Sequence, residues 1–308
     1  MAKIATREAY GKALAKLIVE NPNVIVLDAD LTKSTKTIDA KNACPERHFN
    51  MGIAEGNMIT TAAGIATSGK TVFASSFSIF ATGRAFEQIR NSICYPKLNV
   101  KVCGTHAGIT VGEDGASHQA LEDIAIMRAV PNMVVIQPCD GKETEEVIKF
   151  ASEYVGPMYI RLGRSAVESV HDDNYKFKFG KGEVIKTGKD IVLISTGLMV
   201  QEALNASEAL KGIGIDVTVV NMPTIKPIDE ELIVELAKNN KVLVTLEEHN
   251  IIGGLGSAVC EVTSAKCPIR VERIGVNDVF GESGTPQELL DKYGLSAEEI
   301  VKRIKAIA

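Results

Sequence analysis

Apolar residues recur along this chain with two spacings, which predict alternating strands and helices. Short runs of mostly β-branched residues, such as residues 24–27, have the length of a buried parallel strand. Residues 6–20 instead carry apolar side chains three or four positions apart, as in an amphipathic helix, and Asn21-Pro22-Asn23 ends this pattern. Strands alternating with helices of this length predict an α/β fold in which mainly parallel sheets are doubly wound.

The pattern occurs twice. In the first part we expect strands at residues 71–75, 98–102, 133–136 and 158–162, and helices at 56–68, 84–93, 120–129 and 141–154. In the second part we expect strands at residues 191–195, 216–221, 242–247 and 269–274, and helices at 199–211, 229–239 and 256–263. The charged, weakly periodic stretch between them is typical of a linker with a short hairpin. We therefore expect two doubly wound domains, at residues 1–170 and 190–308, and a linker at 171–189.

Two local patterns in the second part have structural interpretations. Gly253-Gly-Leu-Gly256 precedes a helix, but it lacks the spacing of a dinucleotide fingerprint, so close backbone packing is the favoured reason for its glycines. Ser296 precedes the last helix and Glu299 follows three residues later, which predicts a capping box.

Composition narrows the class of partner. The 308 residues are 45% hydrophobic and 24% charged, and the net charge is −5 without a basic cluster. This argues against nucleic-acid binding, and no apolar run has the length of a membrane span. The first ten residues lack the apolar core of a signal peptide, and the six cysteines form no Cys-x-x-Cys pair. We expect a cytoplasmic protein with reduced, structural cysteines, no metal ligands of its own, and a small molecule or another protein as partner.

The loop at residues 104–123 concentrates chemically active side chains. It contains His106, Glu113, Asp114 and His118 together with four glycines. It follows a predicted strand and precedes a predicted helix, which places these side chains at the carboxyl edge of a sheet, where open α/β folds bind ligands. The alternative is a solvated polar loop with two histidines that have no function.

Other candidates are ambiguous when taken alone. Asp30 and Ser34 follow the predicted strand at residues 24–27, but Asp30 could equally cap a helix. Glu55 begins a mostly buried helix, where the helix dipole favours any carboxylate, so spacing alone favours a structural role. Phe77 and Phe80 are more often core residues than cofactor contacts.

Together these segments resemble a known family. The resemblance to the transketolase family of thiamine diphosphate enzymes covers nearly the whole chain and rests on Gly52-Ile-Ala-Glu55, Phe77 with Phe80, the 104–123 loop, Arg161-Leu-Gly-Arg164 and Glu247-Glu-His-Asn-Ile-Ile-Gly-Gly-Leu-Gly256. It corresponds to the pyrimidine-binding and C-terminal domains only. The Gly-Asp-Gly motif of the first transketolase domain, which with a later Asn holds Mg²⁺ and the diphosphate, is absent from the sequence. The chain therefore resembles the C-terminal subunit of a split transketolase.

The resemblance implies roles for individual residues. Glu55 matches the catalytic glutamate that hydrogen-bonds N1′ of the aminopyrimidine, and Phe77 and Phe80 match the aromatic residues that stack on this ring. Asp30 matches an aspartate near the cofactor, and His118 matches a histidine that handles protons at the substrate carbonyl and hydroxyl. The substrate-binding positions are Asp114, which matches the residue that reads the C2 hydroxyl of the donor, and the phosphate ligands Arg7, Ser34, His106 and Arg164.

The resemblance also implies partners. Thiamine diphosphate would be the cofactor, with the Mg²⁺ ligands on an N-terminal subunit that carries the Gly-Asp-Gly motif. Two such pairs would form a dimer of heterodimers, and sugar phosphates of the pentose phosphate pathway would be the substrates.

Three departures keep alternatives open. Ala107-Gly108 stands where the family usually has Asp-Ser, as in deoxyxylulose-phosphate synthase, although that enzyme keeps all its domains in one chain. Gly83 replaces a family tyrosine, which predicts a more open pocket. Residues 86–91 are similar to the β subunit of 2-oxo acid dehydrogenases, but the phosphate-type residues favour transketolase. A non-catalytic scaffold is a further alternative, disfavoured by Glu55, Asp114 and His118 together.

Overall fold

The computed structural model of the chain describes residues 3–307. Contacts between Cα atoms divide the chain into two compact units. The first unit extends to Ala107 and resumes over Ile126–Phe177, and the second comprises Gly108–Ala125 and the chain from Lys178 onward. The stretch at residues 108–125 therefore groups with the second unit, whereas we expected it within the first domain.

The first unit is built on a parallel sheet. Its strands lie in the order β6 (Val134–Ile136), β7 (Met158–Arg161), β5 (Val100–Thr105), β4 (Thr71–Phe77), β2 (Val24–Asp28) and β3 (His48–Asn50), and every neighbouring pair is parallel. Every residue of β2, β4 and β5 is buried, as expected when helices cover both faces of a parallel sheet. The doubly wound α/β arrangement is confirmed in this unit.

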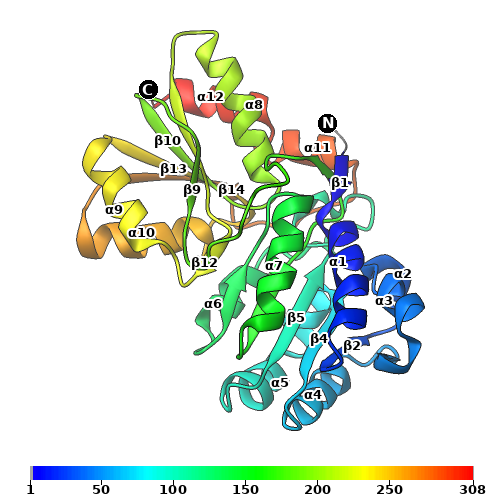
Figure 1. Cartoon of the computed structure of the whole chain (residues 1–308). Coiled ribbons are helices and arrows are strands. Elements are labelled where there is room, and N and C mark those ends of the chain that lie inside the picture. Colours follow the sequence, from blue (N-terminus) through cyan, green and yellow to red (C-terminus); the bar gives the residue numbers. More distant parts are fainter. Residues whose placement is uncertain (1–2, 308) are drawn as a thin grey trace. The chain divides into compact units, whose positions relative to one another are not determined.

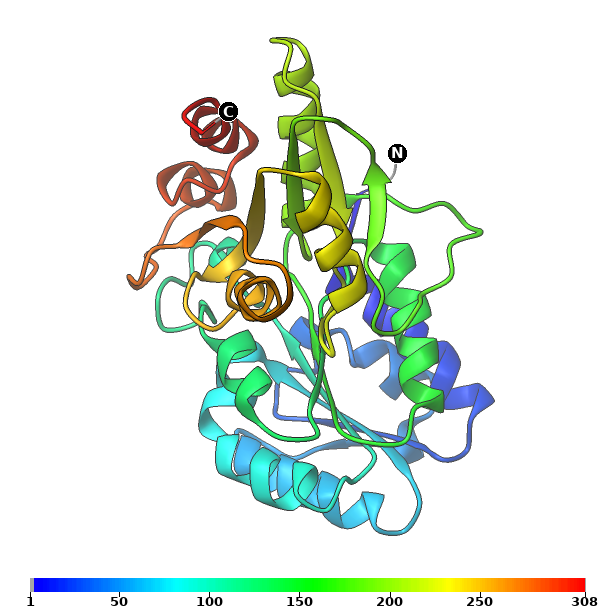
Figure 2. The same cartoon turned by 90° about the vertical axis from the view of Figure 1, so that its left-hand side faces the viewer.

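Helices flank this sheet. On one face, α1 (Thr6–Glu20) lies beside α7 (Gly141–Glu153), whereas α4 (Glu55–Ala66) packs against β4 on the other (Figures 1 and 2). Smaller elements complete the unit: α2 (Thr32–Thr35), α3 (Ile38–Ala43), α5 (Phe86–Gln88), α6 (Asp123–Ala129), which begins in the second unit, and an antiparallel pair of β1 (Lys3–Ala5) and β8 (Ala166–Glu168).

The helix predicted at residues 84–93 is interrupted. The chain forms a π-helical segment at Phe80–Arg84, the short α5, and a second π-helical segment at Ile89–Cys94. Such segments are rare and occur frequently at functional sites. The apolar spacing predicted helical structure correctly but could not reveal the wider turns.

The second unit has its own sheet. Its strands lie in the order β14 (Arg270–Val276), β13 (Val242–Asn250), β10 (Ile191–Ser195), β11 (Val217–Asn221) and β9 (Glu183–Lys186), and β9 alone among them is antiparallel to its neighbour. The helices are α8 (Met199–Lys211), α9 (Glu230–Asn239), α10 (Leu255–Lys266), α11 (Pro286–Lys292) and α12 (Ala297–Lys305), and β12 (Thr224–Lys226) follows β11. Two apolar clusters, one with α8 and α12 and one with α9 and α10, form its core.

The capping box predicted at Ser296 is wrong. The Ser296 side chain is buried and makes no capping hydrogen bond, and Glu202 instead accepts a hydrogen bond at this helix start, from the Ala297 amide at 2.7 Å. A capping box is present one helix earlier, where Thr285 and Glu288 bond each other's backbone at the start of α11. The two positions differ in burial, which the sequence pattern does not reveal.

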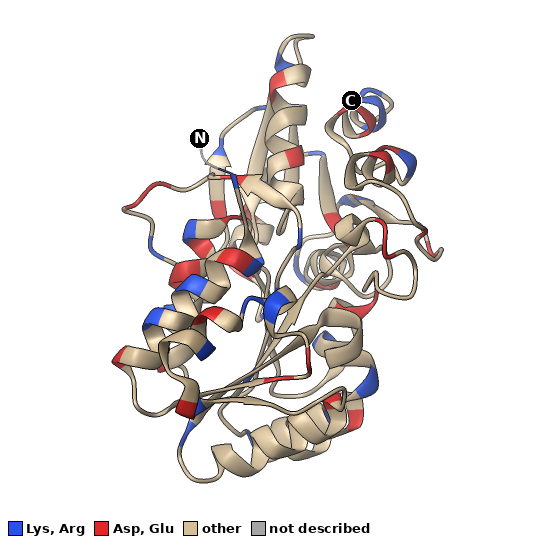
Figure 3. Ribbon diagram, turned by 90° about the vertical axis from the view of Figure 1, so that its right-hand side faces the viewer, with Lys and Arg blue, Asp and Glu red and all other residues tan. Residues whose placement is uncertain are grey.

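Charged side chains of both signs lie on the surface. Lys and Arg are interspersed with Asp and Glu on the face drawn in Figure 3. Among residues 3–307, no helix combines the length and apolar character that crossing a membrane requires.

Candidate functional site

The carboxyl ends of four neighbouring strands meet at one edge of the first sheet. Strand pairing sets Asp28 beside Ser75, Phe77 beside Thr105, and Gly104 beside Arg161. Residues that follow these strands therefore lie side by side, although they are far apart in the sequence. The candidate residues of the first unit are Arg7, Asp30, Ser34, Glu55, Phe77, Phe80, His106 and Arg164.

Glu55 is a buried carboxylate at the start of α4. It is only 4% exposed, and Nη1 of Arg84 lies 3.3 Å from its Oε1 and 3.4 Å from its Oε2. Phe77 and Phe80 form a stacked pair with ring centroids 6.0 Å apart, and the Arg84 guanidinium lies 4.1 Å from the centre of the Phe80 ring. A buried carboxylate and an aromatic face are thus linked by one cation.

Arg7, Ser34, His106 and Arg164 form a cationic cluster. Nη1 of Arg7 donates to the Ser34 carbonyl oxygen at 2.9 Å and lies 3.2 Å from Nε2 of His106. Burial lowers the pKa of Arg7; the charge of Glu8 opposes this, and the nearby charge of Arg164 adds to it. Nε of Arg7 is buried without a hydrogen-bond partner among the described residues. Two cations and an unused buried donor are the chemistry that an oxyanion matches.

Two of these residues have left-handed backbone conformations. His106 has φ 55° and directly follows β5. Asp30 has φ 63° and lies two residues beyond the end of β2. The His106 ring lies 3.9 Å from that of Phe77, whereas Asp30 accepts a hydrogen bond from the Asn50 side chain at 2.9 Å. Such conformations are uncommon for non-glycine residues and are frequent at functional sites.

The second unit holds Asp114 and His118. Asp114 is exposed, and Nδ1 of His118 lies 2.9 Å from the Ser117 hydroxyl. The stretch that carries them is anchored by Glu248, whose Oε1 accepts from the Thr110 amide at 2.5 Å. Gly108 has φ 83°, and a Cβ there would lie 2.3 Å from the Glu248 carboxyl carbon. Only glycine fits at position 108, because the Glu248 carboxyl group lies directly against the backbone there.

The glycines at residues 253–256 serve an internal carboxylate. Oε2 of Glu247 accepts from the Leu255 amide at 2.7 Å, and Oε1 accepts from the Gly256 amide at 2.8 Å. A Cβ at Gly254 would lie 1.9 Å from Glu247 Oε2. The start of α10 thus binds an anion, but this anion is a side chain of the same unit. Glu247 is the first residue of the motif at residues 247–256, and the sequence alone assigned no role to it.

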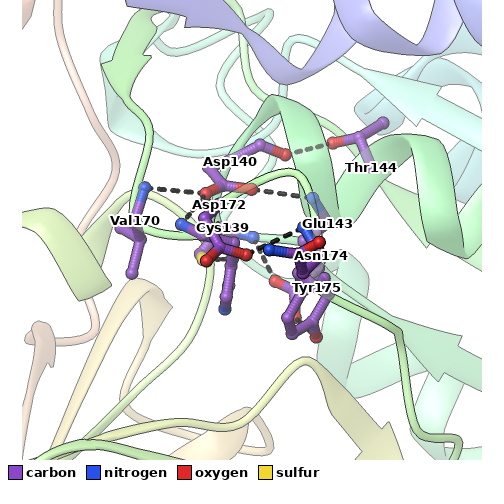
Figure 4. A network of polar contacts seen from close by, with 9 residues as sticks. Cys139, Asp140, Glu143, Thr144, Val170, Asp172, Asn174 and Tyr175 are labelled. Atoms are coloured by element: carbon purple, nitrogen blue, oxygen red, sulfur yellow. Dashed lines mark hydrogen bonds and ion pairs between the residues drawn. The ribbon is translucent and has the colours of Figure 1, made fainter. Parts of the chain in front are cut away.

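A polar network joins α7 to the segment after β8 (Figure 4). Cys139, Asp140 and His171 place potential metal ligands within 4.8 Å of one another. Asp140, however, uses both oxygens: Oδ2 accepts from the Val170 and His171 amides and from His171 Nδ1, and Oδ1 accepts from the Glu143 amide.

The ionisation of this network indicates a structural role. Burial raises the pKa of Cys139, and the neighbouring charges of Glu143 and Asp140 raise it further, so the thiol stays protonated in the folded chain. Burial alone would raise the pKa of Asp140, but hydrogen bonds from His171 and from backbone amides outweigh it and lower this pKa. The network is a hydrogen-bonded connection that holds residues 170 and 171 against the start of α7.

The first unit thus brings together the residues predicted to bind phosphate, and it places Glu55 near the aromatic pair. Sequence reasoning missed Arg84. Its only signal was its position four residues after Phe80, which predicts a contact in helical structure.

Comparisons with known proteins identify the family to which both halves of the chain belong. Residues 2–169 match the family model described as transketolase, pyrimidine binding domain, and residues 180–300 match transketolase, C-terminal domain. A relative from Methanocaldococcus jannaschii, named "Putative transketolase C-terminal section", is 54% identical over 97% of this chain and 94% of its own length. A 6-deoxy-6-sulfo-D-fructose transketolase subunit, SqwH, from Clostridium sp. is 39% identical over 96% of this chain and 92% of its own.

A solved structure is similar over its full length. It is described as a split-gene transketolase in an inactive β4 tetramer, with 55% identity, a TM-score of 0.91, and coverage of 99% of this chain and 98% of that one.

Proposed function

This chain belongs to the transketolase family, and on that premise we propose that it is the C-terminal subunit of a split transketolase. With an N-terminal partner it transfers a two-carbon ketol unit from a ketose phosphate to an aldose phosphate. The proposal rests mainly on the buried carboxylate of Glu55, which lies near the aromatic pair Phe77 and Phe80. The cationic cluster around Arg7 lies at the carboxyl edge of the same sheet. The assembly is a cytoplasmic dimer of heterodimers that serves the pentose phosphate pathway.

The residues present fit the aminopyrimidine half of thiamine diphosphate. Glu55 is buried at a helix start and already binds a flat cationic group, that of Arg84. Phe77 and Phe80 offer a stacked aromatic surface, and Asp30 lies at the same strand edge. The bound cofactor supplies an electron sink for cleavage of a carbon–carbon bond. Glu55 holds the ring nitrogen N1′ and its proton, and its burial makes that hydrogen bond strong.

The diphosphate and Mg²⁺ require a second chain. The sequence contains no Gly-Asp-Gly motif. We assign these ligands to the N-terminal partner, so that each chain supplies half of the cofactor site. The chain alone then has an incomplete site.

The cationic cluster is proposed to bind the terminal phosphate of the sugar. Arg7 and Arg164 supply the charge, and the unused Nε of Arg7 supplies a donor. Ser34 and His106 border the same position. In the second unit, Asp114 reads the C2 hydroxyl of the donor sugar and His118 moves protons at the substrate carbonyl and hydroxyl.

A sulfonated sugar is the second candidate substrate. The observation that favours it is the 39% identity with a 6-deoxy-6-sulfo-D-fructose transketolase subunit. A sulfonate presents three oxygens to the same arginines but carries one negative charge.

Reconstitution tests the proposal. The chain is mixed with a partner subunit that carries Gly-Asp-Gly, in the presence of Mg²⁺ and thiamine diphosphate, and ketol transfer is followed with phosphorylated and sulfonated ketoses. We expect transfer with the mixture and none with either subunit alone. A mixture that assembles and binds the cofactor but transfers no ketol unit would contradict the proposed function.

A further inference from the structure

Arg84 makes two contacts at the proposed cofactor site. Its Nη1 lies 3.3 Å from Oε1 and 3.4 Å from Oε2 of Glu55, and its guanidinium carbon lies 4.1 Å from the centre of the Phe80 ring. The Arg84 side chain is 53% exposed, whereas that of Glu55 is 4% exposed. A long, partly solvated cation therefore covers both a buried carboxylate and an aromatic face.

The local backbone explains how one side chain reaches both groups. Phe80–Arg84 is π-helical, and because its hydrogen bonds close over five residues, side chains four apart lie nearly above each other. At the neighbouring Gly83, no atom of the described residues lies within 4 Å of where a Cβ would stand. The surface next to Arg84 is open at this point.

The two contacts are those assigned above to the aminopyrimidine ring. A guanidinium is also a flat group with N–H donors, which binds carboxylates and lies on aromatic faces. We propose that Arg84 is a placeholder, which holds Glu55 and the face of Phe80 in the free chain and is displaced when the pyrimidine ring binds. This inference rests on the proposed function, because it assumes that the pyrimidine uses Glu55 and Phe80.

Charge and exposure favour such an exchange. A buried carboxylate without a partner pays a desolvation cost, which the Arg84 cation offsets in the free chain. Arg84 itself keeps half of its surface in water, so its release exposes little that was buried, and an ion pair of this kind is weak. The exchange keeps Glu55 paired at all times and lowers cofactor affinity by a moderate factor.

Cofactor affinity in the assembled complex tests the placeholder role. Isothermal titration with thiamine diphosphate at saturating Mg²⁺ gives Kd for the wild type, Arg84→Gln, and the control Arg90→Gln, which changes an exposed arginine on the next segment. We expect Arg84→Gln to bind about fivefold more tightly, as the loss of one exposed ion pair and one cation–π contact predicts. Arg84→Lys keeps the charge without the flat group and should lie in between, and Arg90→Gln should not change Kd.

A double-mutant cycle shows whether the effect passes through Glu55. In a Glu55→Gln background, Arg84→Gln should change Kd by less than about twofold, because the carboxylate charge with which it pairs is gone.

The outcomes separate this inference from the proposed function. Unchanged or weaker binding by Arg84→Gln, in a complex whose wild type binds the cofactor, would overturn the placeholder role and leave the proposed function intact. A wild-type complex that binds no thiamine diphosphate would overturn both.

Discussion

Nη1 of Arg7 lies 3.2 Å from Nε2 of His106, and this contact fixes the state of the histidine. A guanidinium has donors only, so Nε2 accepts and carries no proton. The ring proton is then on Nδ1, which lies 2.9 Å from the Thr105 hydroxyl oxygen and donates to it. Thr105, His106 and Arg7 therefore form one hydrogen-bonded chain, in which Arg7 donates to the ring and the ring donates to Thr105.

Arg164→Ala tests the phosphate role of the cluster to which this pair belongs. In the reconstituted complex we expect KM for phosphorylated sugars to rise about ten- to hundredfold, since a charge-assisted hydrogen bond contributes about 1.5 to 3 kcal/mol. KM for an unphosphorylated, erythrulose-like donor should change little. Equal losses with both kinds of substrate would show that the cluster binds no terminal phosphate.

Glu55→Gln tests the catalytic carboxylate. Because the diphosphate anchor lies on the partner chain, cofactor affinity should stay largely intact, while ketol transfer falls by about 10²- to 10⁴-fold. Proton exchange at C2 of the bound cofactor, followed by NMR, reports the same step without a substrate. Near wild-type exchange in the variant would remove Glu55 from the mechanism.

Asp140→Asn tests the structural connection between α7 and the segment after β8. We expect the free energy of unfolding at neutral pH to fall by about 2 kcal/mol, because the variant loses the charged oxygen that accepts from the Val170 and His171 amides and from the His171 ring, although Asn can still cap α7. Asp173→Asn, an exposed change in the same segment, is the control and should have no effect.

The pH dependence has a defined sign. The pKa of Asp140 is lowered in the folded chain, because hydrogen bonds to its carboxylate outweigh the opposing effect of burial. Its contribution is therefore complete above the unfolded pKa of about 3.9 and is lost as pH falls through the folded value. The difference in urea unfolding between the wild type and the variant should shrink as pH falls below about 4, where Asp140 takes up a proton. A difference that grows as pH falls below about 4 would contradict this assignment.

Gly108→Ala tests the anchoring of the stretch that carries Asp114 and His118. The new Cβ would meet the Glu248 carboxyl group at 2.3 Å from a backbone with φ 83°, so we expect a loss of about 2 kcal/mol or more. Gly64→Ala on α4, where no described atom lies within 4 Å of the new Cβ, should instead raise stability by up to about 1 kcal/mol. Thermal unfolding of both variants measures the difference. Equal Tm values for the two would show that Glu248 yields without cost.

Local patterns predicted most elements, because buried strands and amphipathic helices carry their signals within a few residues. The strand expected at residues 191–195 is β10, and the helix expected at 199–211 is α8. Features that depend on distant residues were not predicted. The Thr110 amide binds Glu248, which is 138 positions away, and this kind of contact groups residues 108–125 with the second unit.

The candidate site was predictable only in part, for a similar reason. Glu55, Phe77 and His106 were named from motifs, but nothing in their spacing showed that His106 would lie against Phe77. Arg84 belongs to no recognisable sequence motif. It contacts Glu55 from a π-helical segment, whose wider turn the apolar spacing does not reveal.

Titration of this chain with thiamine diphosphate, with and without the partner subunit, tests the central claim most directly. Isothermal titration of the chain alone should show no tight, Mg²⁺-dependent binding, because the sequence carries no Gly-Asp-Gly motif for the diphosphate. Addition of the Gly-Asp-Gly partner should produce tight binding that disappears when Mg²⁺ is removed. Tight, Mg²⁺-dependent binding by the chain alone would contradict the split-subunit account.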